Sequence, residues 1–284
     1  MFPVLFSIGN FSVSSFGVFL TLGFLLGIFL VWRLCRAWDL DEEKILDITL
    51  VTFIGGLIGA RLYFVISHLQ LFMASPLNLI LINKFPGFSF WGGILGGWLM
   101  LFFFTRRKRL DFWQLADIAS VGLIGGMILS SLGCFLGGCN VGSTSKDFFA
   151  VTMLGSAGRR WPVQIVEALL LAISLRYMWS KAVHFHQRGK IVSLGFIYIG
   201  FTKLILEPFK ANHSGAFFSA VFVLLGLTIF YKITKQNPLT HAKSVIKSFN
   251  MQNFKKSWYN QKTNISWQFR NFKKLLKKSN VKFS

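Results

Sequence analysis

The sequence is rich in apolar residues and poor in charged ones. Of its 284 residues, 53% are hydrophobic, 33 are phenylalanine and only 14% are charged. A soluble domain usually carries about 25% charged residues, and one globule of this size cannot hide so much apolar surface. The composition excludes an ordinary soluble protein and predicts an all-α polytopic integral membrane protein.

The charge is unevenly distributed along the chain. The formal net charge is +21, yet all ten acidic residues lie at or before Glu207. The region 235–284 holds 12 Lys and Arg residues and no acid. A basic block after the last apolar segment is typical of a cytoplasmic tail that contacts anionic lipid headgroups, and we favour this over a nucleic-acid partner. We therefore predict a transmembrane domain at 1–234 and a basic tail, partly disordered or interfacial, at 235–284.

A membrane-spanning helix needs about 20 mostly apolar residues. Seven segments fit, the third and seventh being short: 14–34, 46–68, 88–104, 112–136, 161–180, 191–208 and 214–232. Lys and Arg concentrate in the first, third and fifth loops and in the tail. By the positive-inside rule these regions face the cytoplasm, so we expect the amino terminus outside and the carboxy terminus inside. Arg33 is the first Lys or Arg, so no basic leader precedes the first span and we expect it to be retained.

Several charged side chains fall inside the predicted spans. A charge at the centre of a membrane helix costs about 2.5–3.5 kcal/mol on insertion scales, so each is a candidate functional residue. Five share the outer half of the membrane in the predicted orientation: Arg61, Arg160, Glu167, Lys203 and Glu207. Asp47 and Asp117 lie at inner ends, where we interpret them as first-turn acids of their helices.

Helical spacing groups these outer residues further. Arg160, Gln164 and Glu167 share one helix face, and Lys203 and Glu207 share another. The set forms either a polar cavity with a function or structural ion pairs that lock the bundle. Spacing alone leaves both interpretations open.

Glycines cluster at two places near the predicted outer side. The run 92–97 contains four glycines, which favour close helix packing. The run 133–142 contains Gly133, Gly137, Gly138 and Gly142 where the fourth span ends. It predicts an irregular loop whose backbone amides suit a phosphate.

Cys134 and Cys139 flank part of the second glycine run. They fit a disulfide, a metal pair, a nucleophile or packing residues. No neighbouring His or Cys completes a metal set, so we predict no metal site. We favour packing or an incidental bridge.

Taken together, these segments resemble the prolipoprotein diacylglyceryl transferase family over roughly residues 2–232. The resemblance is carried by six runs that occur in the family's order: Phe2–Gly9, Gly55–Tyr63, Ser89–Gly93, Gly133–Gly142, Arg160–Glu167 and Lys203–Lys210. Each run alone is weak, whereas the ordered set is fairly specific.

The resemblance implies an enzyme of the bacterial cytoplasmic (inner) membrane that works on its outer side without a cofactor. Such an enzyme moves the diacylglyceryl group of phosphatidylglycerol onto the lipobox cysteine of a preprolipoprotein, and glycerol phosphate leaves. The catalytic residues would be Glu207, Lys203 and Glu167. The substrate-binding residues would be Arg61, Trp91, Gly92, Gly93, Gly133, Gly138, Gly142, Arg160 and Gln164.

Four positions depart from the family pattern. Trp91 and Trp161 replace histidines, and Ser131 and Lys203 replace arginines. His68 and His213, at predicted outer helix ends, are the nearest substitutes. Two other functions therefore stay open: a noncatalytic membrane protein of the same fold that binds lipid or signal peptide, and a transporter with a buried charge pathway.

Overall fold

The structure, a computed structural model, describes residues 4–8, 11–73, 87–153, 157–184, 186–211 and 215–235. Seven long helices hold most of them: α1 (Ser15–Ala37), α2 (Glu42–Ser67), α4 (Phe90–Arg107), α5 (Phe112–Gly137), α6 (Val163–Ala182), α7 (Lys190–Leu206) and α8 (Ala216–Thr234). They follow the seven predicted spans in order, the largest shift being the start of α2 at Glu42 instead of residue 46. Six of them are long and apolar enough to cross a membrane, α4 being the exception and α7 counting together with the turn that continues it to Phe209. The prediction of an all-helical membrane fold is confirmed.

Polar residues mark where several helices begin. The side chains of Ser14, Asp41 and Asp111 accept hydrogen bonds from backbone N–H groups in the first turns of α1, α2 and α5. Such caps satisfy amides that have no partner inside the helix. They set the boundaries that hydropathy alone placed within a few residues.

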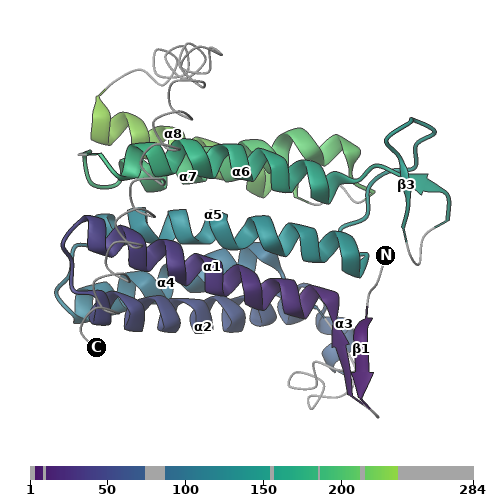
Figure 1. The fold of residues 1–284 in the computed structure, drawn as a ribbon, viewed down its shortest axis with the longest axis horizontal. Coiled ribbons are helices and arrows are strands. Elements are labelled where there is room, and N and C mark those ends of the chain that lie inside the picture. Colours follow the sequence, from purple (N-terminus) through teal and green to yellow (C-terminus); the bar gives the residue numbers. More distant parts are fainter. Residues whose placement is uncertain are drawn as a thin grey trace, which may run out of the picture. The chain divides into compact units, whose positions relative to one another are not determined.

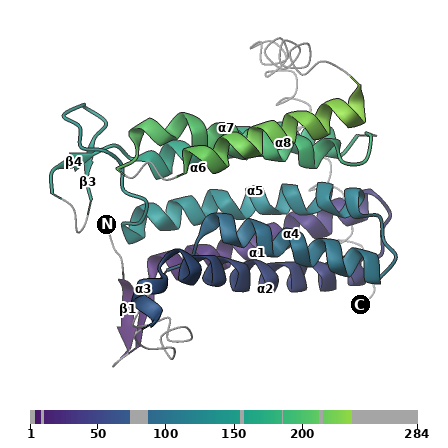
Figure 2. The ribbon, with the colours of Figure 1, turned by 180° about the vertical axis from the view of Figure 1, so that it is seen from behind.

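Helix α5 occupies the centre of the bundle. Figures 1 and 2 show it between α6, α7 and α8 on one side and α1, α2 and α4 on the other. Ile118, Val121 and Ile124 of α5 are at most 1% exposed and join a core that includes Leu171 of α6 and Ile191 of α7. Because both helix groups pack on α5, its ends fix the positions of the neighbouring loops.

Glycines bring α2 and α4 into close contact. A Cβ on Gly59 would lie 2.6 Å from the carbonyl oxygen of Gly92, and a Cβ on Gly96 would lie 2.4 Å from that of Gly55. The run 92–97 therefore serves helix packing, as predicted.

The small elements gather at one end of the bundle, hereafter the hairpin end (Figure 1). Here β1 (Val4–Ile8) pairs antiparallel with β2 (Phe11–Ser14), and β3 (Val151–Thr152) pairs with β4 (Arg159–Arg160). The short helix α3 (Leu69–Met73) follows α2, and the 3-10 turn η2 (Glu207–Phe209) follows α7. None of these strands was predicted from the sequence. The hairpin end is the end predicted to lie outside.

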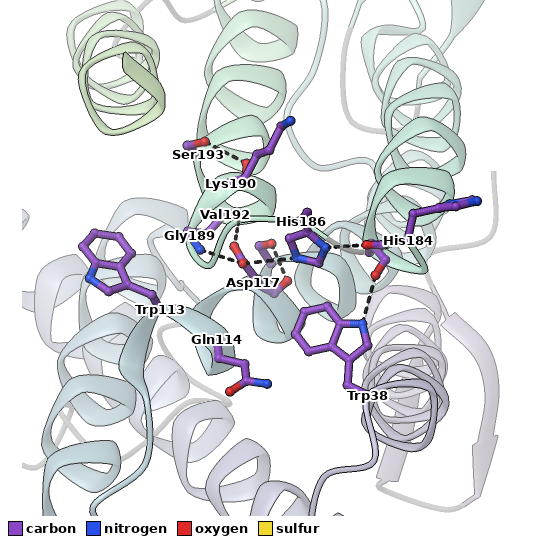
Figure 3. A network of polar contacts seen from close by, with 12 residues as sticks. Trp38, Trp113, Gln114, Asp117, His184, His186, Gly189, Lys190, Val192 and Ser193 are labelled. Atoms are coloured by element: carbon purple, nitrogen blue, oxygen red, sulfur yellow. Dashed lines mark hydrogen bonds and ion pairs between the residues drawn. The ribbon is translucent and has the colours of Figure 1, made fainter. Parts of the chain in front are cut away.

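The prediction that Asp117 lies in the first turn of its own helix is wrong. Helix α5 begins at Phe112, and Asp117 points across to the start of α7 (Figure 3). The backbone N–H groups of Gly189 and Val192 each donate to its carboxylate at 2.7 Å. The acid therefore caps a neighbouring helix at the end opposite the hairpin end.

The basic tail lies outside the described residues after Lys235. Its role as a separate lipid-contacting region stays a prediction, as does the orientation of the two ends across the membrane.

Candidate active site

The loop after α5 begins with a glycine that the helix end requires. Gly138 has φ +75°, the left-handed conformation that glycine adopts readily where a helix stops. The next residue, Cys139, forms a disulfide with Cys134 of the last turn, their Cα atoms lying 5.0 Å apart. Of the four possibilities for this cysteine pair, the structure selects the bridge.

The loop then runs between two other segments of the hairpin end. The N–H of Ser143 donates to the carbonyl of Phe209 at 2.8 Å, and the N–H of Trp161 donates to the carbonyl of Ser143 at 3.1 Å. Gly142 and Lys210 form a β-bridge on the η2 side. A Cβ on Gly142 would lie 2.1 Å from the carbonyl oxygen of Trp161, so glycine is needed here.

Arg160 of β4 and Gln164 in the first turn of α6 reach this loop. Arg160 Nη1 donates to the Gly142 carbonyl at 3.1 Å, while Gln164 Nε2 donates to the carbonyls of Cys139 and Asn140 at 2.6 and 3.1 Å. In the part of the chain that the structure describes, Arg160 Nε and Gln164 Oε1 are buried without a partner. Buried polar atoms are nearly always hydrogen-bonded. This donor and this acceptor are therefore candidates for binding a polar group of a ligand.

One turn deeper, a buried ion pair joins α6 to α7. Lys203 Nζ lies 2.8 Å from Glu167 Oε1, and the two side chains are 12% and 6% exposed. The ammonium also lies 4.0 Å from the ring centroid of Phe90 at the start of α4, a cation–π arrangement. Two predicted catalytic residues thus form one buried pair beside an aromatic ring.

Glu207, the third predicted catalytic residue, holds the loops together. Its Oε2 lies 2.7 Å from Lys210 Nζ, and its Oε1 accepts the backbone N–H of Gly215 at 2.6 Å. Since Lys210 also bridges to Gly142, these contacts fit a positioning role. A catalytic role for Glu207 stays a prediction.

Arg61 and Trp91 make their contacts elsewhere at this end. Arg61 donates to the carbonyl of Gly87 at 3.1 Å and lies over the rings of Phe64 and Phe72. Trp91 stacks on Phe218 of α8, with ring centroids 5.5 Å apart. Their substrate-binding roles stay predictions.

The predicted substrate-binding glycines fall into two groups. Gly138 and Gly142 shape the loop, whereas Gly92 packs on α2 and Gly133 on α1. Gly93 faces Ala60 of α2 at an ordinary contact distance. These packing contacts do not test whether the glycines contact substrate, so that role stays a prediction.

Sequence reasoning missed two partners in the site. Phe90 carried no signal, because its contact with Lys203 depends on how α4 and α7 are rotated. Lys210 was detectable, since it follows Glu207 by three residues and can reach back to it.

No replacement histidine reaches the site within the described residues. His68 Nδ1 lies 3.0 Å from the carbonyl of Phe64 on α2, and His213 lies outside the described residues. The described part of the chain also holds no group of three His, Cys, Asp or Glu side chains that would suit a metal ion.

The fold and site define a multi-pass membrane protein with a buried ion pair and an ordered, glycine-containing loop at one end of its helices. Residues 3–232 match the family model of the prolipoprotein diacylglyceryl transferases, so the chain belongs to that family. Proteins called phosphatidylglycerol–prolipoprotein diacylglyceryl transferase are among its relatives. The one from Clostridium tetani is 27% identical over 81% of this chain and 97% of its own length. The one from Thermoanaerobacter sp. (strain X514) is 28% identical over 74% and 79%. The one from Deinococcus radiodurans is 36% identical, but over 49% of this chain and 42% of its own length.

Proposed function

We propose that the chain transfers the diacylglyceryl group of phosphatidylglycerol to the lipobox cysteine of a preprolipoprotein. The thiol loses its proton, and the sulfur attacks the glyceryl carbon that carries the phosphate ester. A C–S bond forms, the C–O bond to phosphate breaks, and glycerol phosphate leaves with the electron pair. No cofactor or metal enters this reaction.

The observation that carries this proposal is the unsatisfied polar pair at the start of α6. Arg160 Nε and Gln164 Oε1 are buried without a partner in the described residues, next to the ordered loop at Gly142. A phosphate ester offers oxygens to the guanidinium, and a glycerol hydroxyl can donate to the amide oxygen. Both groups occur in phosphatidylglycerol. The ligand that would complete this pair therefore has the chemistry of that lipid headgroup.

The buried Lys203–Glu167 pair is suited to the changing charge of the reaction. A free thiol has a pKa near 8.5 and needs help to become the nucleophilic thiolate. Glu167 can accept the thiol proton while Lys203 balances the negative charge that builds on the leaving phosphate. Glu207 and Lys210 keep the loop in place for this step.

The finer setting of the reaction belongs to the proposal as well. We place the hairpin end on the outer side of the bacterial inner membrane, where preprolipoproteins emerge. The basic tail, 235–284, would contact anionic lipid headgroups on the cytoplasmic side.

One observation favours the noncatalytic alternative. Trp91, at the position of a family histidine, packs against Phe218 and Phe222 and so provides no titratable group there. A protein of this kind would bind lipid or signal peptide without turnover.

Complementation distinguishes the two possibilities. A bacterium depleted of its own transferase is supplied with this chain or with Arg160→Ala. We expect growth with the first and none with the second, although both insert in the membrane. Lys146→Ala is the matched control, since it removes an exposed positive charge from the same end. Full growth with Arg160→Ala would remove Arg160 from the site, and no growth with the unaltered chain would favour the noncatalytic alternative.

A further inference from the structure

A second polar site lies at the end opposite the hairpin end, where α6 turns into α7. A pocket of about 300 Å³ opens there, lined by Ser180, Lys181, His184, His186 and Lys190. No carboxylate is among these lining residues, and the proposed reaction uses none of them. The pocket therefore needs an explanation of its own.

His186 is held in place by acceptors on both ring nitrogens (Figure 3). Its Nδ1 lies 2.8 Å from the carbonyl of His184, and its Nε2 lies 3.5 Å from the carboxylate of Asp117. The ring of Trp38 packs against it at a centroid distance of 5.0 Å. Only the imidazolium form donates from both nitrogens. His186 is therefore a fixed wall of the pocket whose charge is balanced by Asp117.

The two lysines of the pocket are available to pair with an anionic ligand. Neither Lys181 nor Lys190 forms an ion pair within the described residues. Asp117, the nearby acid, is fully buried behind His186 and accepts two backbone N–H groups. The open side of the pocket is thus cationic, with two ammonium groups and a serine hydroxyl as donors.

We propose that this pocket binds a phosphate group, supplied by an anionic lipid headgroup of the adjacent leaflet or by free phosphate. Helix α6 ends here and helix α7 begins here, and the ends of membrane-spanning helices lie in the headgroup layer. Ammonium groups are strong partners for phosphate oxygens. The volume falls at the lower limit of small-molecule sites, about 300–1,000 Å³, which suits a headgroup better than a whole lipid.

Local hydrogen–deuterium exchange of the full chain tests this proposal. The protein is placed in nanodiscs of phosphatidylcholine alone, of phosphatidylcholine with phosphatidylglycerol, or of phosphatidylcholine with added inorganic phosphate. Peptides that cover 180–190 report on the pocket, and peptides that cover 139–145 report separately on the proposed active site. The comparison uses Lys181→Gln with Lys190→Gln, and Lys232→Gln as a control at the end of α8.

We expect the anionic lipid to slow exchange in 180–190 in the unaltered chain and in Lys232→Gln. In the double variant the lipid concentration for half of this effect should rise about 30-fold, since each of the two lysines near the membrane contributes about 1 kcal/mol. The same protection from inorganic phosphate alone would assign free phosphate as the ligand. Absent protection in both arms, or protection unchanged in the double variant, would overturn the proposal. If the double variant does not fold, the two single variants take its place. Turnover of a lipobox peptide is scored independently and decides only the proposed reaction.

Discussion

Lys203 stands where relatives of this chain are expected to carry arginine, and its surroundings show what the exchange preserves. The ammonium keeps a positive charge 2.8 Å from Glu167 and over the ring of Phe90. It loses the planar fork that binds phosphate in two places. The Arg160 guanidinium, at the start of α6, still provides such a fork. The proposed phosphate binding at this end should therefore depend more on Arg160 than on Lys203.

Removing one partner of the buried pair should separate its structural role from its chemical one. Lys203→Met leaves the Glu167 carboxylate buried without a counter-charge, which costs about 3–5 kcal/mol. We expect a lower melting temperature and no transfer activity. Combining Lys203→Met with Glu167→Gln should restore most of the stability but none of the activity, and Lys203→Arg should keep both. Activity in the stable double variant would show that the pair is only structural.

Sequence reasoning found these two residues but not their pairing. Hydropathy and loop charge set how deep Glu167 and Lys203 lie, and helical spacing sets which residues share a face. Neither sets the rotation of α6 and α7 relative to each other. The contact of Lys203 with Phe90 depends in the same way on how α4 and α7 are rotated relative to each other.

At the scale of elements, α2 and α4 offer a matched test of helix packing. A Cβ on Gly96 would lie 2.4 Å from the carbonyl oxygen of Gly55, whereas a Cβ on Gly97 would meet its nearest atom at 3.5 Å. Gly96→Ala should therefore lower the melting temperature clearly, and Gly97→Ala should leave it nearly unchanged. Equal effects in thermal unfolding would show that α2 and α4 do not pack through this face.

The disulfide at the end of α5 should contribute to stability but not to catalysis. Closing so short a loop stabilises by about 2 kcal/mol in the chain-entropy model. Replacing both Cys134 and Cys139 by Ser should lower stability by about that amount and keep most activity. Gln164 still holds the loop through two carbonyls, and the reacting thiol belongs to the substrate. Stability is followed by unfolding with and without reductant. Complete loss of activity in the stable variant would indicate a chemical role for the cysteines.

The start of α7 should respond to pH through His186. Burial lowers the pKa of His186, but its hydrogen bonds to Asp117 and to the His184 carbonyl outweigh burial and the repulsion from Lys190, so the pKa is raised above 6.5. A raised folded-state pKa gives stability that is complete below the unfolded value of 6.5 and is lost as pH rises through the folded value. The melting temperature should fall over that window. His186→Gln should lack this step, and an unchanged pH profile in that variant would contradict the assignment.

For the whole molecule, long apolar segments determined what could be predicted. The seven helices and their order follow from hydropathy, because each needs about 20 apolar residues to span a membrane. The strands β3 and β4 have two residues each, too few for an alternating pattern to appear. Asp117 was wrongly predicted to act on the first turn of its own helix, because its partners, Gly189 and Val192, lie over 70 residues away in the sequence. Contacts between distant segments assemble the site, so the sequence named most candidates without their arrangement.

The most direct measurement is the mass of a lipobox peptide after incubation with the purified chain in phosphatidylglycerol vesicles. We expect the peptide to gain a diacylglyceryl group on its cysteine sulfur, with glycerol phosphate released in equal amount. A peptide with Ser in place of that cysteine should stay unchanged, as should the normal peptide incubated with Arg160→Ala. If the Clostridium tetani relative modified the peptide under the same conditions and this chain did not, the proposed transferase activity would be contradicted.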